Sequence, residues 1–99
     1  EIWRQWAYYV AWLQGKKAKT TGEASSVKRV ASEMMVKISQ VGLEVLGMYG
    51  PLKKGSKGAR LNGAFEYACQ HDLGMTIAGG TTEIQKNLIA WRELELPRN

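Results

Sequence analysis

An apolar stripe with the period of a helix runs through residues 23–46 and constrains the fold more than any other feature of this chain. Apolar side chains recur there at alternating spacings of four and three residues, at Val27, Ala31, Met34, Ile38, Val41 and Val45. Such spacing places these side chains on one face of an α-helix. The segment therefore predicts a long helix whose apolar face packs against other helices. We expect Met34 and Met35 to take part in that packing, because methionine fills helix interfaces well.

Three shorter helices are predicted, over residues 1–14, 64–73 and 82–94. In the first, Ile2, Trp6, Tyr9 and Leu13 share one face, and Gly15 suits a left-handed C-cap. Its other faces are also apolar or aromatic, so we expect an oligomeric partner or further sequence to cover it. A short connection to residue 23 favours an antiparallel hairpin. Strand patterns are absent, and the predicted fold class is all-α.

Composition argues against several kinds of site. Cys69 and His71 are the only cysteine and the only histidine, so no intrachain disulfide, cysteine cluster or histidine pair is available, and we predict no metal. The apolar runs are too short to cross a bilayer, so we expect no membrane association. The net charge of +5 is spread along the chain. Without a continuous basic face we expect no nucleic acid as partner, and nucleic-acid binding is only a distant third hypothesis.

The length of 99 residues allows one small domain at most. Glu1 opens inside a helical pattern, with neither an initiator methionine nor a signal peptide before it. From this we expect a fragment of a longer protein in a cytoplasmic setting.

Two glycine-rich breaks are the candidate functional sites. Residues 47–51 interrupt the long helix, and the pair Gly79-Gly80 precedes the last helix. Thr82 and Gln85 have the spacing of a capping box at the start of that helix. Bare glycine backbone at a helix end can present N–H groups to a phosphate, a carboxylate or a polarised carbonyl. His71 beside Asp72 is not expected to form a proton relay, because adjacent residues on a helix point apart. From the residues alone we infer a helical module that binds an anionic ligand or a partner.

The second break lies in a more specific string. Thr76-Ile-Ala-Gly-Gly-Thr-Thr-Glu-Ile-Gln-Lys-Asn87, ending in Trp91-Arg-Glu-Leu-Glu-Leu-Pro-Arg98, resembles the C-terminal signature of the acyl-CoA dehydrogenase family of flavoenzymes. Glu44-Val-Leu-Gly-Met-Tyr-Gly50 resembles a second element of that family. The resemblance implies that residues 1–99 are the C-terminal portion of the family's helical domain. The fold would be antiparallel helices that form most of an up-and-down four-helix bundle, which this chain leaves incomplete.

The resemblance also implies an activity and its partners. Such enzymes are oxidoreductases of fatty acid metabolism, which remove an α-proton from an acyl-CoA while a hydride passes from Cβ to FAD. Electron-transfer flavoprotein or a similar carrier then accepts the electrons. The subunits form homo- or hetero-oligomers, dimers or tetramers. Because much of the active site would lie outside this chain, we expect the isolated fragment to be inactive.

Family positions carry over residue by residue. Glu44, Gly47 and Met48 would contact the FAD diphosphate across a subunit interface, and Thr81 and Glu83 the adenosine end of FAD. The backbone N–H of Gly79 would polarise the thioester carbonyl, and Gly80 would line the acyl-CoA site.

Three departures from the family pattern matter, at Glu44, Met48 and Gly79. Gly79 stands where many members have their catalytic glutamate, and glycine cannot act as a base, so no catalytic base lies in this chain. Glu44 replaces the usual glutamine and puts a carboxylate near a diphosphate, while Met48 replaces a glycine and narrows access to the backbone. The base would come from an earlier helix, or the chain belongs to a base-free subunit of a heteromeric dehydrogenase. A non-catalytic helical interaction or scaffold module is the alternative from another class.

Overall fold

The computed structural model describes residues 1–98, and all regular elements in that range are helical. They are α1 (Ile2–Gly15), α2 (Thr21–Leu46), α3 (Ala64–Met75) and α4 (Thr82–Arg92), with short 3-10 turns at Gly47–Tyr49 and Arg60–Gly63. The prediction of an all-α chain is confirmed, and each helix lies within a few residues of its predicted range. Contacts group the described chain into two compact units. We call residues 1–31 together with the chain from Gly79 onward the terminal unit, and residues 32–78 the central unit.

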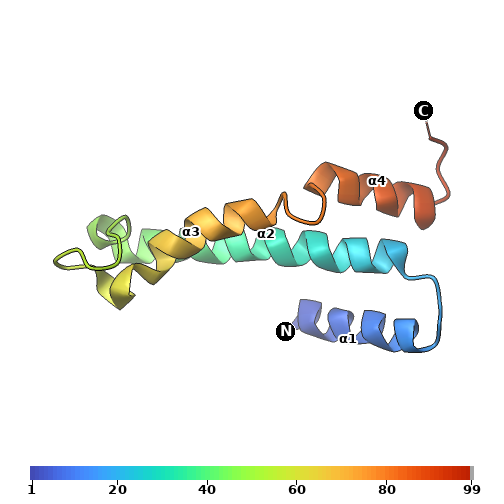
Figure 1. The fold of residues 1–99 in the computed structure, drawn as a ribbon, viewed down its shortest axis with the longest axis horizontal. Coiled ribbons are helices and arrows are strands. Elements are labelled where there is room, and N and C mark those ends of the chain that lie inside the picture. Colours follow the sequence, from blue (N-terminus) through green and yellow to red (C-terminus); the bar gives the residue numbers. More distant parts are fainter. Residues whose placement is uncertain (99) are drawn as a thin grey trace. The chain divides into compact units, whose positions relative to one another are not determined.

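In the terminal unit, α1 and the start of α2 run in opposite directions, as the hairpin prediction requires (Figure 1). The helix α4 also belongs to this unit, and it contacts α2 where the backbone N–H of Gly22 donates to Glu93 Oε1 at 3.1 Å. Any side chain at residue 22 would overlap that of Glu93. Glycine at the start of α2 thus permits a close approach to the end of α4.

The end of α1 differs from its prediction. Gly15 is the last residue of the helix, and the C-cap is Lys16, whose φ of −84° is not left-handed. The left-handed residue is Lys17, with a φ of 57°. Lys16 is held in place by a hydrogen bond from its backbone N–H to Leu13 O and by its ammonium group, which lies 3.9 Å from the centre of the Trp12 ring. These contacts stabilise the end of the helix at Lys16, and the left-handed residue follows at Lys17.

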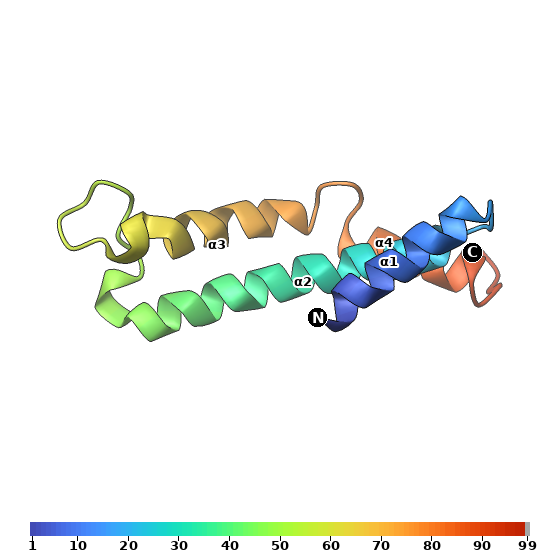
Figure 2. The same ribbon diagram turned by 90° about the horizontal axis from the view of Figure 1, so that it is seen from below.

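In the central unit, the later part of α2 runs antiparallel to α3, and both views show the two segments side by side (Figures 1 and 2). The ring of Phe65 lies against Gly42, where a Cβ atom would overlap it. Ser39 is the most deeply buried residue here, at 2% exposure, and its hydroxyl donates to the carbonyls of Met35 and Val36. The contact between α2 and α3 is therefore lined by small residues.

The apolar stripe of α2 does not form an internal core as expected. Met34, Ile38, Val41 and Val45 are exposed, from 38% at Met34 to 81% at Val45, and Met35 is exposed as well. The buried positions of α2 are instead small residues, Gly22, Ser25, Ser32 and Ser39. In the described part of the chain, Val10 is the only apolar side chain that is buried, at 7% exposure. The prediction placed the stripe correctly on one face of the helix but assigned the wrong face to contacts within this chain.

Candidate functional site

The glycine-pair loop, Gly79 to Thr81, leads into α4. Gly79 has a φ of 70° and Gly80 a φ of 101°, backbone conformations that side chains other than glycine rarely adopt. Thr81 is the N-cap of α4, and its hydroxyl accepts a hydrogen bond from the backbone N–H of Ile84 at 3.3 Å. The capping box predicted from Thr82 is therefore wrong by one residue. Thr82 is already helical, and Gln85 does not reach back to cap it.

Both carbonyls of the glycine pair are held by side chains. Gln85 is buried, and its side-chain amide donates to Gly79 O at 2.9 Å, with a longer contact to Gly80 O at 3.5 Å. Lys28, on α2, donates to Gly80 O at 2.7 Å. The N–H groups of Gly79 and Gly80 form no hydrogen bond within residues 1–98. The loop thus combines anchored carbonyls with N–H groups that can receive a ligand.

Thr81 and Glu83, the two residues predicted to bind the adenosine end of FAD, lie at the start of α4. The pKa of Glu83 is lowered, first by a hydrogen bond from its own backbone N–H, then by the Thr81 hydroxyl and by the charge of Lys86. The Thr81 hydroxyl thus accepts from the N–H of Ile84 and also favours the ionised form of Glu83. Hydroxyl and carboxylate are groups that can bind the hydroxyls or the amino group of a nucleoside.

The other three predicted FAD-binding residues lie at the end of α2. Gly47 has a φ of 53°, and a Cβ atom there would meet nothing within 4 Å, so the backbone is open. Glu44 is exposed, and Met48 is 93% exposed. The C-terminal end of a helix carries a partial negative charge, and the carboxylate of Glu44 adds to it. Both charges make this place less favourable for a diphosphate. Glu44, Gly47 and Met48 are in the central unit, whereas Gly79, Gly80, Thr81 and Glu83 are in the terminal unit.

Sequence reasoning missed Lys28 and misassigned Gln85. Lys28 is 52 residues from Gly80 along the chain, and no local pattern connects the two. Gln85 was expected to cap a helix, yet it is a buried polar residue that anchors the preceding loop. A polar residue on the inner face of a short helix was the available signal.

A pocket of about 580 Å³ lies in the central unit. Two lysines line it beside an aromatic ring and polar groups, and the lining comprises Lys53, Lys54, Asn62, Gly63, Ala64, Glu66, Tyr67 and Gln70. Glu66 accepts a hydrogen bond from Gln70. None of the residues predicted to bind FAD or acyl-CoA lines this pocket.

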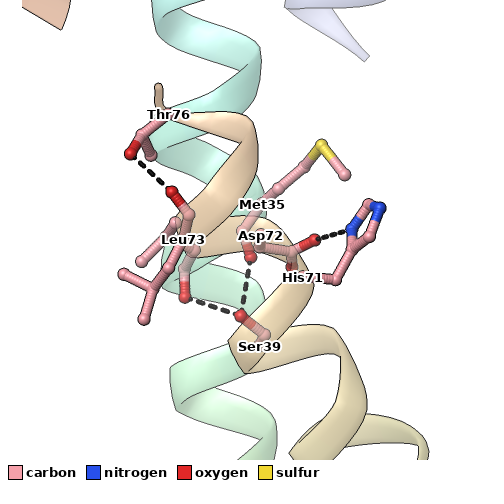
Figure 3. A network of polar contacts seen from close by, with 7 residues as sticks. Met35, Ser39, His71, Asp72, Leu73 and Thr76 are labelled. Carbon is pink, nitrogen blue, oxygen red and sulfur yellow. Dashed lines mark hydrogen bonds and ion pairs between the residues drawn. The ribbon is translucent and has the colours of Figure 1, made fainter. Parts of the chain in front are cut away.

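His71 and Asp72 make a contact that the sequence argument excluded. His71 Nδ1 is 3.2 Å from Asp72 Oδ1, and Figure 3 shows the imidazole turned toward the carboxylate. Asp72 is buried, whereas the His71 side chain is about half exposed and stacks on Tyr67. The expectation that the two side chains point apart is wrong, because the exposed ring can rotate back along the helix.

Within the described range, no three His, Cys, Asp or Glu side chains are grouped so that they could hold a metal ion. None of the helices between residues 1 and 98 has the length and apolar character that a membrane span requires.

Comparison with known proteins gives consistent matches. Residues 1–94 match the family model described as acyl-CoA dehydrogenase, C-terminal domain. Acyl-CoA dehydrogenase FadE26 of Mycobacterium tuberculosis is 36% identical over 76 residues, which make up 77% of this chain and 19% of FadE26.

Solved structures agree in fold. A chain in the crystal structure of the ChsE4-ChsE5 complex from Mycobacterium tuberculosis is similar, with a TM-score of 0.87 and 28% identity over 99% of this chain and 25% of that one. A chain of the Tcur3481-Tcur3483 steroid ACAD has a TM-score of 0.90 over 99% of this chain and 26% of its own. Its identity of 22% shows the fold alone. The chain thus spans about a fifth to a quarter of the length of these relatives.

Proposed function

This chain belongs to the acyl-CoA dehydrogenase family, within its C-terminal domain, and we propose that it is part of an FAD-dependent enzyme that oxidises an acyl-CoA between Cα and Cβ. In that reaction a base outside this chain would remove a proton from Cα, and bound FAD would supply the acceptor for the hydride that leaves Cβ. Electron-transfer flavoprotein or a similar carrier then takes up the electrons. The part played by this chain is to bind and orient, because it brings no catalytic base to the site.

The glycine-pair loop is the observation that supports this proposal. Gly79 and Gly80 leave N–H groups without partners, and a Cβ atom at residue 79 would meet nothing within 4 Å. A thioester oxygen can therefore approach the Gly79 N–H. A hydrogen bond to that oxygen stabilises the negative charge that develops when Cα loses its proton. Gly80 would line the same acyl-CoA site.

Three of the predicted residues, Thr81, Glu83 and Gly47, suit the binding of FAD, whereas Glu44 opposes it. Thr81 and Glu83 offer a hydroxyl and a carboxylate to the adenosine, and Gly47 offers open backbone to the diphosphate. Glu44 adds a negative charge where a diphosphate is expected. Binding of a diphosphate beside Glu44 requires a cation from a part of the protein outside residues 44–48.

An oligomer of two kinds of subunit is the assembly we propose. In the terminal unit, α1 exposes Trp3, Trp6 and Trp12. In the central unit, the later part of α2 exposes Ile38 and Val45. Exposed apolar side chains of this kind need a cover in water. Gly79 stands at the position where many family members have their base, which favours a base-free subunit. A base on an earlier helix of the same subunit is the competing arrangement. A non-catalytic helical module remains the alternative from another class.

The test uses the full-length protein, purified alone and together with proteins encoded beside it. We expect a yellow protein whose flavin absorbance bleaches when an acyl-CoA is added, from a panel of straight-chain, branched and steroid side-chain thioesters. Bleaching only in the mixed preparation would identify the base-free subunit. If neither preparation takes up FAD, the proposal is wrong, and the result supports a non-catalytic helical module.

A further inference from the structure

We infer that Lys28 and Gln85 are positioning residues, which hold the glycine-pair loop so that its backbone N–H groups face the bound ligand. The inference deepens the proposed function and rests on it for the ligand, the thioester carbonyl of an acyl-CoA. It concerns two side chains outside the set of predicted site residues. Its basis is two hydrogen bonds to the carbonyl groups of the loop, one from Lys28 on α2 and one from Gln85 on α4.

The direction of each N–H follows from the carbonyl of the same peptide. Among the described residues no peptide bond is cis. In a trans peptide the C=O and the N–H point in opposite directions within one plane. Because Gln85 holds Gly79 O, the N–H of Gly80 points away from Gln85. Because Lys28 holds Gly80 O, the N–H of Thr81 points away from Lys28. Each of these two donors is thereby directed away from the residue that anchors its own peptide. The N–H of Gly79 lies in the preceding peptide, and it is fixed relative to the anchored Gly79 carbonyl through the φ of 70° and the ψ of that residue.

The loop needs such anchors because two successive glycines leave its backbone many accessible conformations. Glycine adopts positive φ angles about as readily as negative ones, so contacts from the surroundings have to select the observed conformation. Gln85 is 5% exposed, so its amide is held by packing as well as by hydrogen bonds. A Cβ atom at residue 80 would lie 2.8 Å from Gln85 Nε2, and glycine is therefore required for the amide to come so close. The conformations of the loop and of Gln85 thus depend on each other.

Lys28 adds a charge to this anchoring. Its hydrogen bond of 2.7 Å joins an ammonium group to a neutral carbonyl, and such charge-assisted bonds are stronger than neutral ones. The same charge withdraws electron density from the peptide, which makes the N–H on the other side a better donor. Lys28 therefore both orients the Gly80–Thr81 peptide and increases its polarity.

The test compares Lys28→Met and Gln85→Met, which keep an unbranched side chain of the same or nearly the same length and remove the donor. Lys28→Arg serves as the conservative variant, and Lys37→Met is the matched control, because Lys37 is an exposed lysine on the same helix. All are made in the full-length protein with any partner subunit present. If Lys28→Met does not fold, Lys28→Leu, which also lacks a donor, takes its place.

The first measurement needs no ligand. The N–H groups of Ile84 and Gln85 donate to the hydroxyl and the carbonyl of Thr81, so their hydrogen exchange reports whether the loop is held. We expect exchange to be about tenfold faster in Lys28→Met and Gln85→Met, the loss of one strong hydrogen bond, and unchanged in Lys28→Arg and Lys37→Met. Unchanged exchange in the two methionine variants at Lys28 and Gln85 would overturn the inference.

The second measurement follows the thioester itself. The flavin is reduced beforehand, so that no turnover occurs, and an acyl-CoA labelled with 13C at the carbonyl is bound. On binding to the wild type, the infrared C=O band should move to lower frequency. Lys28→Met and Gln85→Met should lose at least half of that shift, and Lys28→Arg should keep it. An unchanged band in the variants would overturn the inference while the proposed function stands. If calorimetry detects no acyl-CoA binding to the wild type, the proposed function fails, and the exchange measurement alone decides whether the two residues hold the loop.

Discussion

The contact between Gly42 and Phe65 gives a quantitative test of how α2 packs. In Gly42→Ala, the new methyl group would overlap the Phe65 ring, so the ring has to move. Overpacking of this kind costs about 1–3 kcal/mol. Alanine also favours a helix over glycine by up to about 1 kcal/mol, which partly hides the cost. A matched control is therefore needed to separate the two effects.

Gly74→Ala supplies that control, because Gly74 is also helical and a Cβ atom there meets nothing within 4 Å. The difference between the two variants cancels the helix propensity and leaves the overlap, about 1–3 kcal/mol, with Gly42→Ala the less stable. In the full-length protein, hydrogen exchange of the amides in α3 measures this difference as a rate ratio of roughly 5 to 150. The double variant Gly42→Ala/Phe65→Leu should recover part of the loss. Equal exchange in Gly42→Ala and Gly74→Ala would show that the ring does not lie on residue 42 and would refute the packing described for α2.

Two further predictions concern the proposed FAD site. Glu44→Gln removes a negative charge from the place proposed for the diphosphate. In a fluorescence titration of the full-length apoprotein, FAD should therefore bind about 2- to 10-fold more tightly. An unchanged affinity would show that Glu44 does not lie near the diphosphate. Glu83 has a lowered pKa, so its ionised form stabilises the folded state above the ordinary value of 4.5, and this stabilisation is lost as the pH falls through the lowered pKa. Wild type should therefore be more stable than Glu83→Gln at pH 7, and the two should converge in acid, as thermal unfolding at several pH values can show; a constant difference would contradict the hydrogen bonds assigned to Glu83.

Much of the candidate site could be predicted from local sequence. The glycine pair, the threonine N-cap and the acidic first turn of α4 are adjacent in the chain, so turn and capping preferences place them together within one residue. The anchoring of that loop could not be predicted in the same way. Lys28 reaches Gly80 only because α2 passes beside the loop, and the partner of Gln85 depends on a backbone with two successive positive φ angles.

The sequence by itself determined the helices and the nature of the glycine-pair loop. Helical periodicity and glycine breaks are local properties, and α2 ends at Leu46, immediately before Gly47, as predicted. Only the tertiary structure decided which face of α2 lies inside. Periodicity says that Met34, Ile38 and Val45 share a face, but not what that face meets. Within this chain, the contacts use the face of Ser25, Ser32 and Ser39, because small side chains let helices approach closely, while the apolar stripe is left exposed.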